Sequence, residues 1–137
     1  MTLAVTESEL RDLLGATPFT RGFGFQLRAI ADGVCTLDVP FQEAFERPGG
    51  IVSGQVFMAA ADVAMWLAIM TRLGKGDMSV TAGMTTAFLH PAAREPFHCT
   101  ASVLRLGRRQ VYGVAECVSG QGKLLTHHTI TYMRPIG

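Results

Sequence analysis

Cysteine is scarce in this chain of 137 residues, and its pattern indicates neither a cross-link nor a metal site. The three cysteines are odd in number and form neither a Cys-x-x-Cys pair nor a metal-ligand spacing with a histidine. We expect Cys35, Cys99 and Cys117 to be reduced residues of the core. The four histidines show no His-Glu-x-x-His or other ligand spacing either, so we expect no metal.

Charge is also scarce and almost balanced. Charged residues make up 17% of the chain, with 12 basic residues against 11 acidic ones. Such a balance gives neither the strong positive field that attracts nucleic acid nor a polybasic patch for a membrane. We therefore expect small molecules and further copies of the chain as partners. The hydrophobic share of 48% is high for a small monomer, which places some apolar surface at a subunit interface.

No unbroken apolar run opens the chain, because Glu7, Glu9, Arg11 and Asp12 fall within its beginning. This start is unlike a signal peptide and predicts a cytoplasmic protein. Residues 51–70 have the length of a membrane span, but a charged residue lies at their middle and no second such segment follows. A helix buried in the protein core fits these residues better.

Local patterns predict the order of the elements. Thr6 and Glu9 have capping-box spacing, Gly15 can end the helix that they begin, and Asp32-Gly33 between alternating apolar runs is a hairpin signal. The expected elements are a helix over 6–14, a hairpin of 23–30 and 35–41, a loop over 42–50, a helix over 51–73, and a meander of strands over 79–89, 97–106, 109–118 and 124–133. Without βαβ alternation or repeats, this order favours an α+β fold in a single domain, 1–137, whose sheet wraps around one long buried helix.

Asp62 is the first candidate for chemistry. It is the only charge between Ile51 and Met70, and its neighbours are alanine, valine and methionine. An ionised side chain is costly to bury unless a function or a partner uses it. The alternative is a structural carboxylate, capped by a hydroxyl or paired with an arginine.

The residues before Asp62 resemble the helix entry of PaaI-like hotdog-fold acyl-CoA thioesterases. That entry commonly reads Asn-x-x-Gly-x-x-His-Gly-Gly, with an acidic residue eight positions after the middle glycine of His-Gly-Gly. Here the stretch runs from Arg47 through Ser53 and Gly54 to Gln55, and Asp62 lies eight residues after Gly54. Residues 81–91 and the turns at 107–109 and 122–124 continue the resemblance over nearly the whole chain. Arg47 and Ser53 stand where the family has Asn and His.

The resemblance implies a hotdog fold and hydrolysis of an acyl-CoA thioester without any cofactor beyond the coenzyme A of the substrate. It also implies a homodimer, and possible assembly of two dimers into a tetramer. The chemistry of the reaction assigns two roles. The backbone N–H of Gly54 at the helix N-terminus would stabilise the negative oxygen, and Asp62 would be the base or the nucleophile.

Helix geometry predicts that these two groups come from different chains. Eight helical residues separate Gly54 from Asp62 by about 12 Å, which is much farther than one reacting carbonyl allows. If both groups act on one thioester, the active site is shared across a dimer in which the central helices run antiparallel. The resemblance implies the same arrangement.

Other residues keep alternative interpretations. The Thr81 hydroxyl could orient the water or the carboxylate, or Thr81 could be present for its strand propensity. Arg47 could donate to the thioester oxygen, recognise a carboxylate on the acyl group, or pair with an acidic residue of its loop. We interpret Ser53 as the helix N-cap, since Gly-x-Ser-x-Gly is absent, and place it with Gln55 among substrate-binding candidates. Arg108 and Arg109 could meet the phosphates of coenzyme A or simply be solvated.

Two rival functions remain beside the thioesterase. The replaced Asn and His positions keep open a non-catalytic acyl-CoA-binding hotdog module, and a purely structural dimer with Asp62 paired to Arg47 is a third reading. A hydratase of the same broad fold would have a histidine five residues after its aspartate, where this chain has Leu67.

Overall fold

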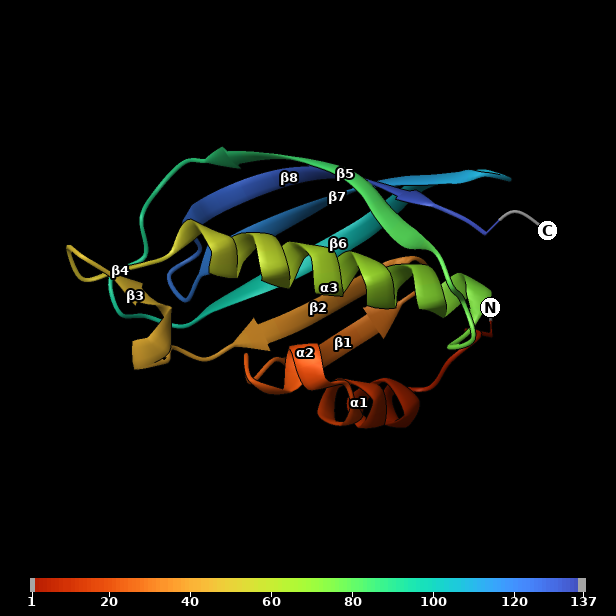
Figure 1. Cartoon of the computed structure of the whole chain (residues 1–137), viewed down its shortest axis with the longest axis horizontal. Coiled ribbons are helices and arrows are strands. Elements are labelled where there is room, and N and C mark those ends of the chain that lie inside the picture. The colour runs from red at the N-terminus through yellow and green to blue at the C-terminus, as the bar shows by residue number, and fades with distance from the viewer. Residues whose placement is uncertain (1, 136–137) are drawn as a thin grey trace.

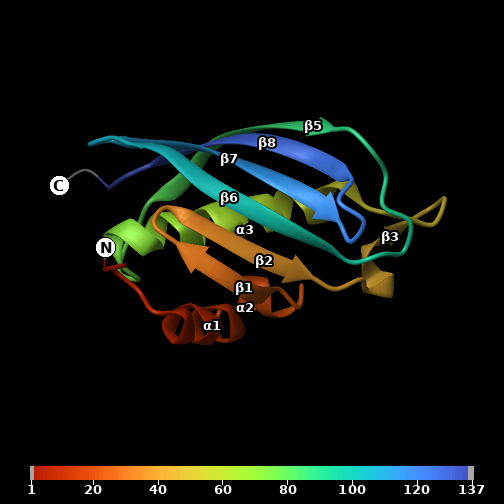
Figure 2. The same cartoon turned by 180° about the vertical axis from the view of Figure 1, so that it is seen from behind.

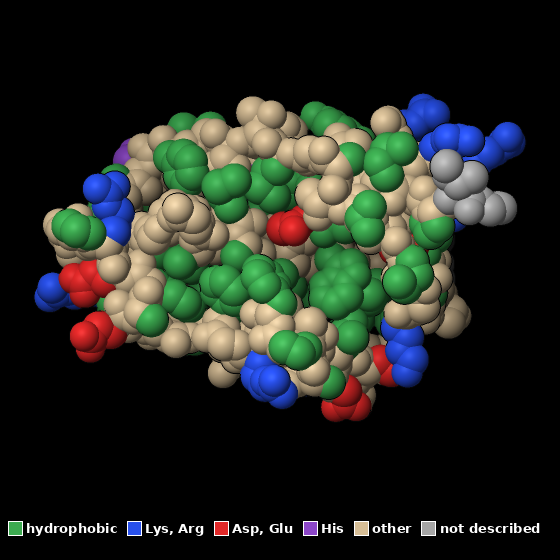
Figure 3. Space-filling model, viewed as in Figure 1, with side chains coloured by type: hydrophobic (Ala, Val, Ile, Leu, Met, Phe, Trp, Pro, Cys, Tyr) green, Lys and Arg blue, Asp and Glu red, His purple; other side chains and the backbone are tan. Residues whose placement is uncertain are grey.

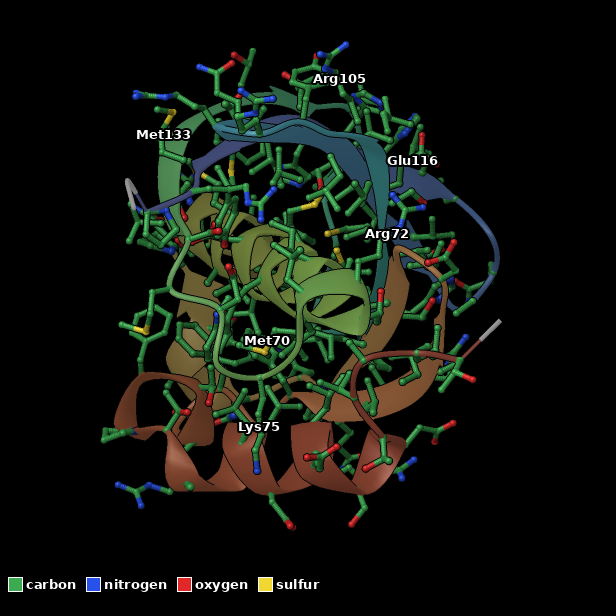
Figure 4. The ribbon with its side chains drawn as sticks, turned by 90° about the vertical axis from the view of Figure 1, so that its right-hand side faces the viewer. Met70, Arg72, Lys75, Arg105, Glu116 and Met133 are labelled. Carbon is green, nitrogen blue, oxygen red and sulfur yellow. The ribbon has the colours of Figure 1, made fainter. Side chains whose placement is uncertain are left out.

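A six-stranded antiparallel sheet wraps around one long helix in the computed structural model, which describes residues 2–135 (Figure 1). The strand order is β1-β2-β6-β7-β8-β5, and the central helix α3 spans Gly54–Leu73. Figure 2 shows the outer face of the sheet with α3 behind it. The sheet also arches over α3 when the molecule is viewed from the end of that helix (Figure 4). The α+β architecture predicted from the sequence is confirmed.

The N-terminal elements follow the predicted local signals. Helix α1 (Glu7–Ala16) begins with a complete capping box, in which the Glu9 amide donates to Thr6 Oγ1 at 3.1 Å and the Thr6 amide donates to Glu9 Oε1 at 3.0 Å. The helix continues past Gly15 by one residue. The short helix α2 (Pro18–Arg21) follows α1, and α1 lies beside β1. Strands β1 (Gln26–Ala31) and β2 (Val34–Val39) form the predicted hairpin.

The hairpin turn is tied to the end of α3. Gly33 has a φ of +70°, a conformation that favours glycine, and its amide donates to Thr71 Oγ1 at 2.8 Å. Next to it Arg72 forms an ion pair with Asp32 at 3.0 Å. These contacts join the first hairpin to the C-terminal end of α3, which Gly74 terminates with a φ of +91°.

The segment before α3 is more ordered than the predicted loop over 42–50, and the prediction that the helix starts at residue 51 was wrong, because residues 51–52 form a strand and α3 begins at Gly54. It contains the 3-10 helix η1 (Glu43–Phe45) and a two-stranded hairpin of β3 (Glu46–Arg47) and β4 (Ile51–Val52). The amide of Ser53 donates to the carbonyl of Phe45 at 2.8 Å. This small hairpin therefore fixes the position at which the chain enters α3.

The later strands have nearly the predicted bounds, but their order in the sheet differs from a simple meander. They are β5 (Val80–Phe88), β6 (Phe97–Leu106), β7 (Gln110–Ser119) and β8 (Leu124–Met133). Strands β6, β7 and β8 are consecutive neighbours, whereas β5 pairs with β8 and lies at the far edge of the sheet. The meander prediction was wrong for β5, because the chain crosses from that edge to β6, which pairs with β2.

The core lies between α3 and the inner face of the sheet. Three adjacent strands contribute Cys35, Cys99 and Cys117, all fully buried, as predicted. Length and hydropathy alone would allow α3 to cross a membrane, but 67% of its most apolar stretch is buried inside the fold. This burial is typical of a core helix.

Candidate active site

Two hydroxyl groups hold the carboxylate of Asp62. Thr81 Oγ1, from β5, and the phenol of Tyr132, from β8, each donate to Asp62 Oδ1 at 2.7 Å. The Tyr132 hydroxyl also lies 2.9 Å from the backbone carbonyl of Asp62. No donor among the described residues bonds Oδ2. The carboxylate is thus fixed through one oxygen, while the other is available to a ligand.

Asp62 is half-buried in the wall of a cavity of about 370 Å³. Thr81, Tyr132, Trp66 and Val80 line the same cavity. No arginine, lysine or histidine among the described residues forms an ion pair with Asp62. A hydroxyl cap of this kind leaves a negative charge facing the cavity, as a base or nucleophile requires.

Sequence reasoning missed Tyr132. Burial, together with the nearby Asp62 carboxylate, raises the pKa of Tyr132, so the phenol stays protonated and continues to donate. A buried tyrosine usually needs a hydrogen-bond partner, and Tyr132 is one of only two tyrosines in the chain. That signal was present, but nothing in the sequence brings position 132 to position 62.

Gly54 is the first residue of α3, and its surroundings differ from those of Asp62. No carbonyl or side chain among the described residues accepts a hydrogen bond from the amide of Gly54 or Gln55, so both N–H groups are available at the positive end of the helix. A side chain at position 54 would press on the ring of Phe88, since a Cβ built there lies 3.0 Å from its Cε1 atom. A side chain at position 54 would therefore require the Phe88 ring to move.

A second cavity, of about 380 Å³, lies beside Gly54. Its walls are mostly apolar and include Ile51, Phe57, Phe88 and Leu89. Arg47 and His90 supply its polar groups. The Nδ1 atom of His90 donates to the carbonyl of Leu124 at 2.9 Å, which leaves Nε2 as the ring nitrogen able to meet a ligand.

The structure separates Gly54 from Asp62 within one chain. The two residues lie on the same uninterrupted helix, and the cavities that they line have no residue in common. The predicted spacing of about 12 Å along the helix axis follows from this geometry. Arg47 lines the cavity of Gly54 and not that of Asp62, so the described chain contains no Arg47–Asp62 pair.

The remaining predicted residues take different places. Ser53 occupies the predicted N-cap position, but its hydroxyl donates to Gln55 Oε1 and caps no backbone amide. Arg108 lines a third cavity, of about 510 Å³, near the C-terminal end of α3, together with Arg134 and Asp77. Arg109 is exposed in the same β6–β7 turn, and its carbonyl accepts from the Arg134 amide.

Residues 2–135 contain no cluster of three His, Cys, Asp or Glu side chains able to hold a metal ion. His127 and His128 lie on opposite faces of β8. His128 is fully buried, where its Nδ1 lies 2.8 Å from Thr86 Oγ1, whereas His127 is half-buried and lies 3.9 Å from Glu116.

One face of the molecule is unusually apolar. Hydrophobic side chains gather over α3 and β5, and most charged side chains lie at the margins of this face (Figure 3). The exposed members include Met58 on α3 and four residues in or next to β5: Met78, Val80, Phe88 and Leu89. Strand β5 is at the open edge of the sheet, while the opposite edge, β1, lies beside α1. An open edge with apolar neighbours is typical of an interface.

Comparison with known proteins identifies the family. The model of the thioesterase superfamily matches residues 49–126, a range that contains Gly54, Asp62 and Thr81. The chain belongs to this superfamily. A protein of Thermoplasma acidophilum that is named as an esterase is 28% identical over 124 residues, which cover 90% of this chain and 93% of the relative.

Solved structures agree with the family assignment. A phenylacetic acid degradation-related protein of Ralstonia eutropha, named as a thioesterase, is 28% identical with a TM-score of 0.81, and the match covers 93% of this chain and 98% of that one. A mutant of the phenylacetic acid degradation protein PaaI of Thermus thermophilus is 26% identical with a TM-score of 0.78, over 87% of this chain and 100% of that one. The chain is thus a PaaI-like member with the hotdog fold, and the names of its relatives support a hydrolase of ester or thioester bonds.

Proposed function

We propose that the protein is an acyl-CoA thioesterase whose two active sites are each shared between two copies of the chain. The observation that carries the proposal is the hydroxyl-held carboxylate of Asp62, with Oδ1 fixed and Oδ2 free, in a chain of the thioesterase superfamily. The substrate is the thioester, and no cofactor takes part beyond the coenzyme A that it carries.

The reaction uses the groups at both cavities. Asp62 Oδ2 takes a proton from water as the water oxygen attacks the carbonyl carbon. In the alternative route, Oδ2 itself attacks that carbon, and water later hydrolyses the resulting acyl–Asp62 anhydride to release the free acid and restore the carboxylate. The carbonyl electrons move onto oxygen, which the free N–H of Gly54 from the other chain stabilises. When the oxygen re-forms the carbonyl, the C–S bond breaks and coenzyme A leaves as the thiol. Its sulfur takes the proton that Asp62 received from water, or a proton from solvent in the nucleophilic route. Thr81 and Tyr132 keep the carboxylate in position throughout.

The exposed face supports the sharing of the site. A second copy would add its β5 beside β5 and bury the apolar side chains on both chains, because a twofold interface brings the same patch together twice. Antiparallel α3 helices would then bring Gly54 of each chain toward Asp62 of the other. Two such dimers could assemble further into a tetramer.

The β6–β7 turn, which contains Arg108 and Arg109, is the proposed binding region for the phosphates of coenzyme A. In the antiparallel arrangement, the C-terminal end of α3 lies beyond the start of the other chain's helix, on the side where Arg108 and Arg109 are found. These arginines would then bind phosphate groups of coenzyme A while the thioester lies at Asp62. The acyl group would then enter the apolar cavity beside Gly54.

Replacement of Asp62 by asparagine tests the function. Asp62→Asn keeps the shape and the acceptor oxygen for Thr81 or Tyr132 but removes basicity, so thiol release from acyl-CoA should fall by roughly a hundredfold to ten-thousandfold. The assay is thiol release over a panel of acyl-CoAs, with circular dichroism and light scattering as controls for fold and assembly. Turnover like that of the unmodified protein would refute the role of Asp62. Binding of acyl-CoA without turnover by the unmodified protein would favour the non-catalytic module.

A further inference from the structure

Arg47 is exposed, and no acidic side chain among residues 2–135 pairs with its charge. Among the described residues, it is the only arginine or lysine that lines the cavity beside Gly54, and no aspartate or glutamate of that part of the chain lines it. Within residues 2–135, Arg47 forms no ion pair and donates no hydrogen bond from its side chain. The apolar cavity at the start of α3 therefore has a single permanent positive charge at its wall.

The nearest acidic neighbour in the sequence is already occupied. Glu46 Oε1 accepts from Arg94 Nε at 2.9 Å and from Arg94 Nη2 at 2.8 Å. Successive side chains of a strand point to opposite sides, so Glu46 and Arg47 of β3 face different surroundings. The Glu46–Arg94 pair thus leaves Arg47 free to meet an anion in the cavity.

The lining of the cavity specifies what kind of ligand fits. Ile51, Phe57, Phe88 and Leu89 favour a hydrocarbon or aromatic segment, whereas the guanidinium group of Arg47 favours an anion that it can bind with two parallel hydrogen bonds. A volume of about 380 Å³ is enough for a short chain together with its terminal group. The combination matches an acyl group that ends in a carboxylate.

We propose that Arg47 selects acyl groups with a terminal carboxylate, so that the preferred substrates are monothioesters of short dicarboxylic acids. This inference rests on the proposed function, because it places the thioester carbonyl at Gly54 and the rest of the acyl group in the same cavity. Arg47 is then a specificity-determining residue and takes no part in proton transfer.

The phosphates of coenzyme A are a second source of anions, so the test varies both parts of the substrate. Hexanoyl and adipoyl groups have equal chain length and differ in the terminal carboxylate, and each is offered on coenzyme A and on N-acetylcysteamine, which has no phosphate. The ratio of kcat/KM for adipoyl to that for hexanoyl is measured in the unmodified protein, Arg47→Gln, Arg47→Lys and Arg105→Gln. Arg105 is the matched control, because it is an exposed arginine that points away from α3 on the outer side of the sheet (Figure 4).

Arg47→Gln should lower kcat/KM for adipoyl thioesters by about tenfold to a hundredfold on both thiols and change it less than about threefold for hexanoyl thioesters. Arg47→Lys should retain part of the preference, and Arg105→Gln all of it. Equal losses for both acyl groups on coenzyme A, with none on N-acetylcysteamine, would assign Arg47 to a phosphate and overturn the proposal. Equal losses on all four substrates would also overturn it, by placing Arg47 at the thioester or at Asp62 of the second copy.

Failure of the proposed function has a different signature. If the unmodified protein hydrolyses none of the four thioesters, the thioesterase assignment fails, and the role of Arg47 is then tested by calorimetric binding of the stable thioether analogues of adipoyl-CoA and hexanoyl-CoA. Tighter binding of the adipoyl analogue that Arg47→Gln abolishes would still support the carboxylate site. Equal binding of the two analogues would refute it.

Discussion

The start and the middle of α3 differ in how many of their polar groups are held by hydrogen bonds within the chain. At the middle, two hydroxyl groups from two strands hold one oxygen of the half-buried Asp62 at 2.7 Å each. At the start, the amides of Gly54 and Gln55 have no acceptor among the described residues, and the adjoining cavity is apolar apart from Arg47 and His90. The geometry is tightly fixed where a proton would move and open where an acyl group would lie.

This difference indicates which substitutions should affect rate and which should affect selectivity. A reactive carboxylate works only if neighbouring side chains hold its orientation, so changes around Asp62 should act on kcat. A pocket wall acts mainly through the fit of the bound group, so changes of the side chains that line the cavity beside Gly54, such as Arg47, should depend on the acyl chain. This contrast is wrong if substitutions in both regions change kcat and acyl preference to the same extent.

Mixing two inactive variants gives the largest expected effect. Asp62→Asn and Gly54→Val, refolded together, should form mixed dimers that contain one site with both groups intact and one with both lost. About half of the dimers are mixed under random exchange, so about a quarter of the unmodified activity should return. Mass spectrometry confirms the mixed dimer, and thiol release is compared with that of each variant refolded alone. A verified mixed dimer without activity would refute the shared site.

Removal of one of the two hydroxyl groups that hold Asp62 should give the next largest effect. Tyr132→Phe removes one donor to Asp62 Oδ1 and should lower kcat by about tenfold to a hundredfold, since hydrogen bonds to charged groups are the stronger ones. KM should stay nearly constant, because the phenol holds the carboxylate and lies away from the acyl cavity. Steady-state kinetics of thiol release measure both constants.

Thr81→Val removes the other hydroxyl group that donates to Asp62 Oδ1, and its effect is compared with that of Tyr132→Phe. Thr81 and Tyr132 donate to the same oxygen, so the double variant should lose less activity than the product of the two single losses. Independent effects on kcat would mean that the two hydroxyls do not act through one carboxylate. A fall in thermal stability that parallels kcat would assign them a structural role.

Much of the fold could be predicted because its signals are local. The capping box at Thr6 and Glu9, the Asp32-Gly33 turn and the apolar run of α3 each depend on residues that are close in sequence. The position of β5 depends on pairing with β8, more than 40 residues later in the register Thr86 to His128, and no local pattern encodes it. The β3–β4 hairpin was missed because its strands are only two residues long.

The candidate site likewise contains residues that local sequence patterns reveal and residues that depend on how distant strands pair. Asp62 stands out in the sequence as one charge in an apolar helix, and Gly54 stands out by its spacing from Asp62. Tyr132 becomes part of the site only when β8 is placed beside β5. The role of Phe88 against Gly54 was equally hidden, since it depends on where the end of β5 meets the start of α3.

Substitution of Gly54 by alanine should give the smallest effect and show what the glycine is for. The new Cβ would lie 3.0 Å from the Phe88 ring, but that ring is 57% exposed and can move by the small distance required. Alanine also favours a helix by up to about 1 kcal/mol over glycine, so the free energy of unfolding should change little. Thiol release should fall by less than about tenfold, because the Phe88 ring can move aside and the cost of one methyl group should then lie near the lower limit of about 1 kcal/mol.

Phe88→Leu supplies the decisive second variant, because it removes ring atoms at the point of contact. If Gly54 is small in order to accommodate Phe88, the double variant Gly54→Ala/Phe88→Leu should recover the activity of Phe88→Leu alone. If the loss persists in the double variant, the missing side chain serves the approach of the thioester to the Gly54 amide, and packing against Phe88 is secondary.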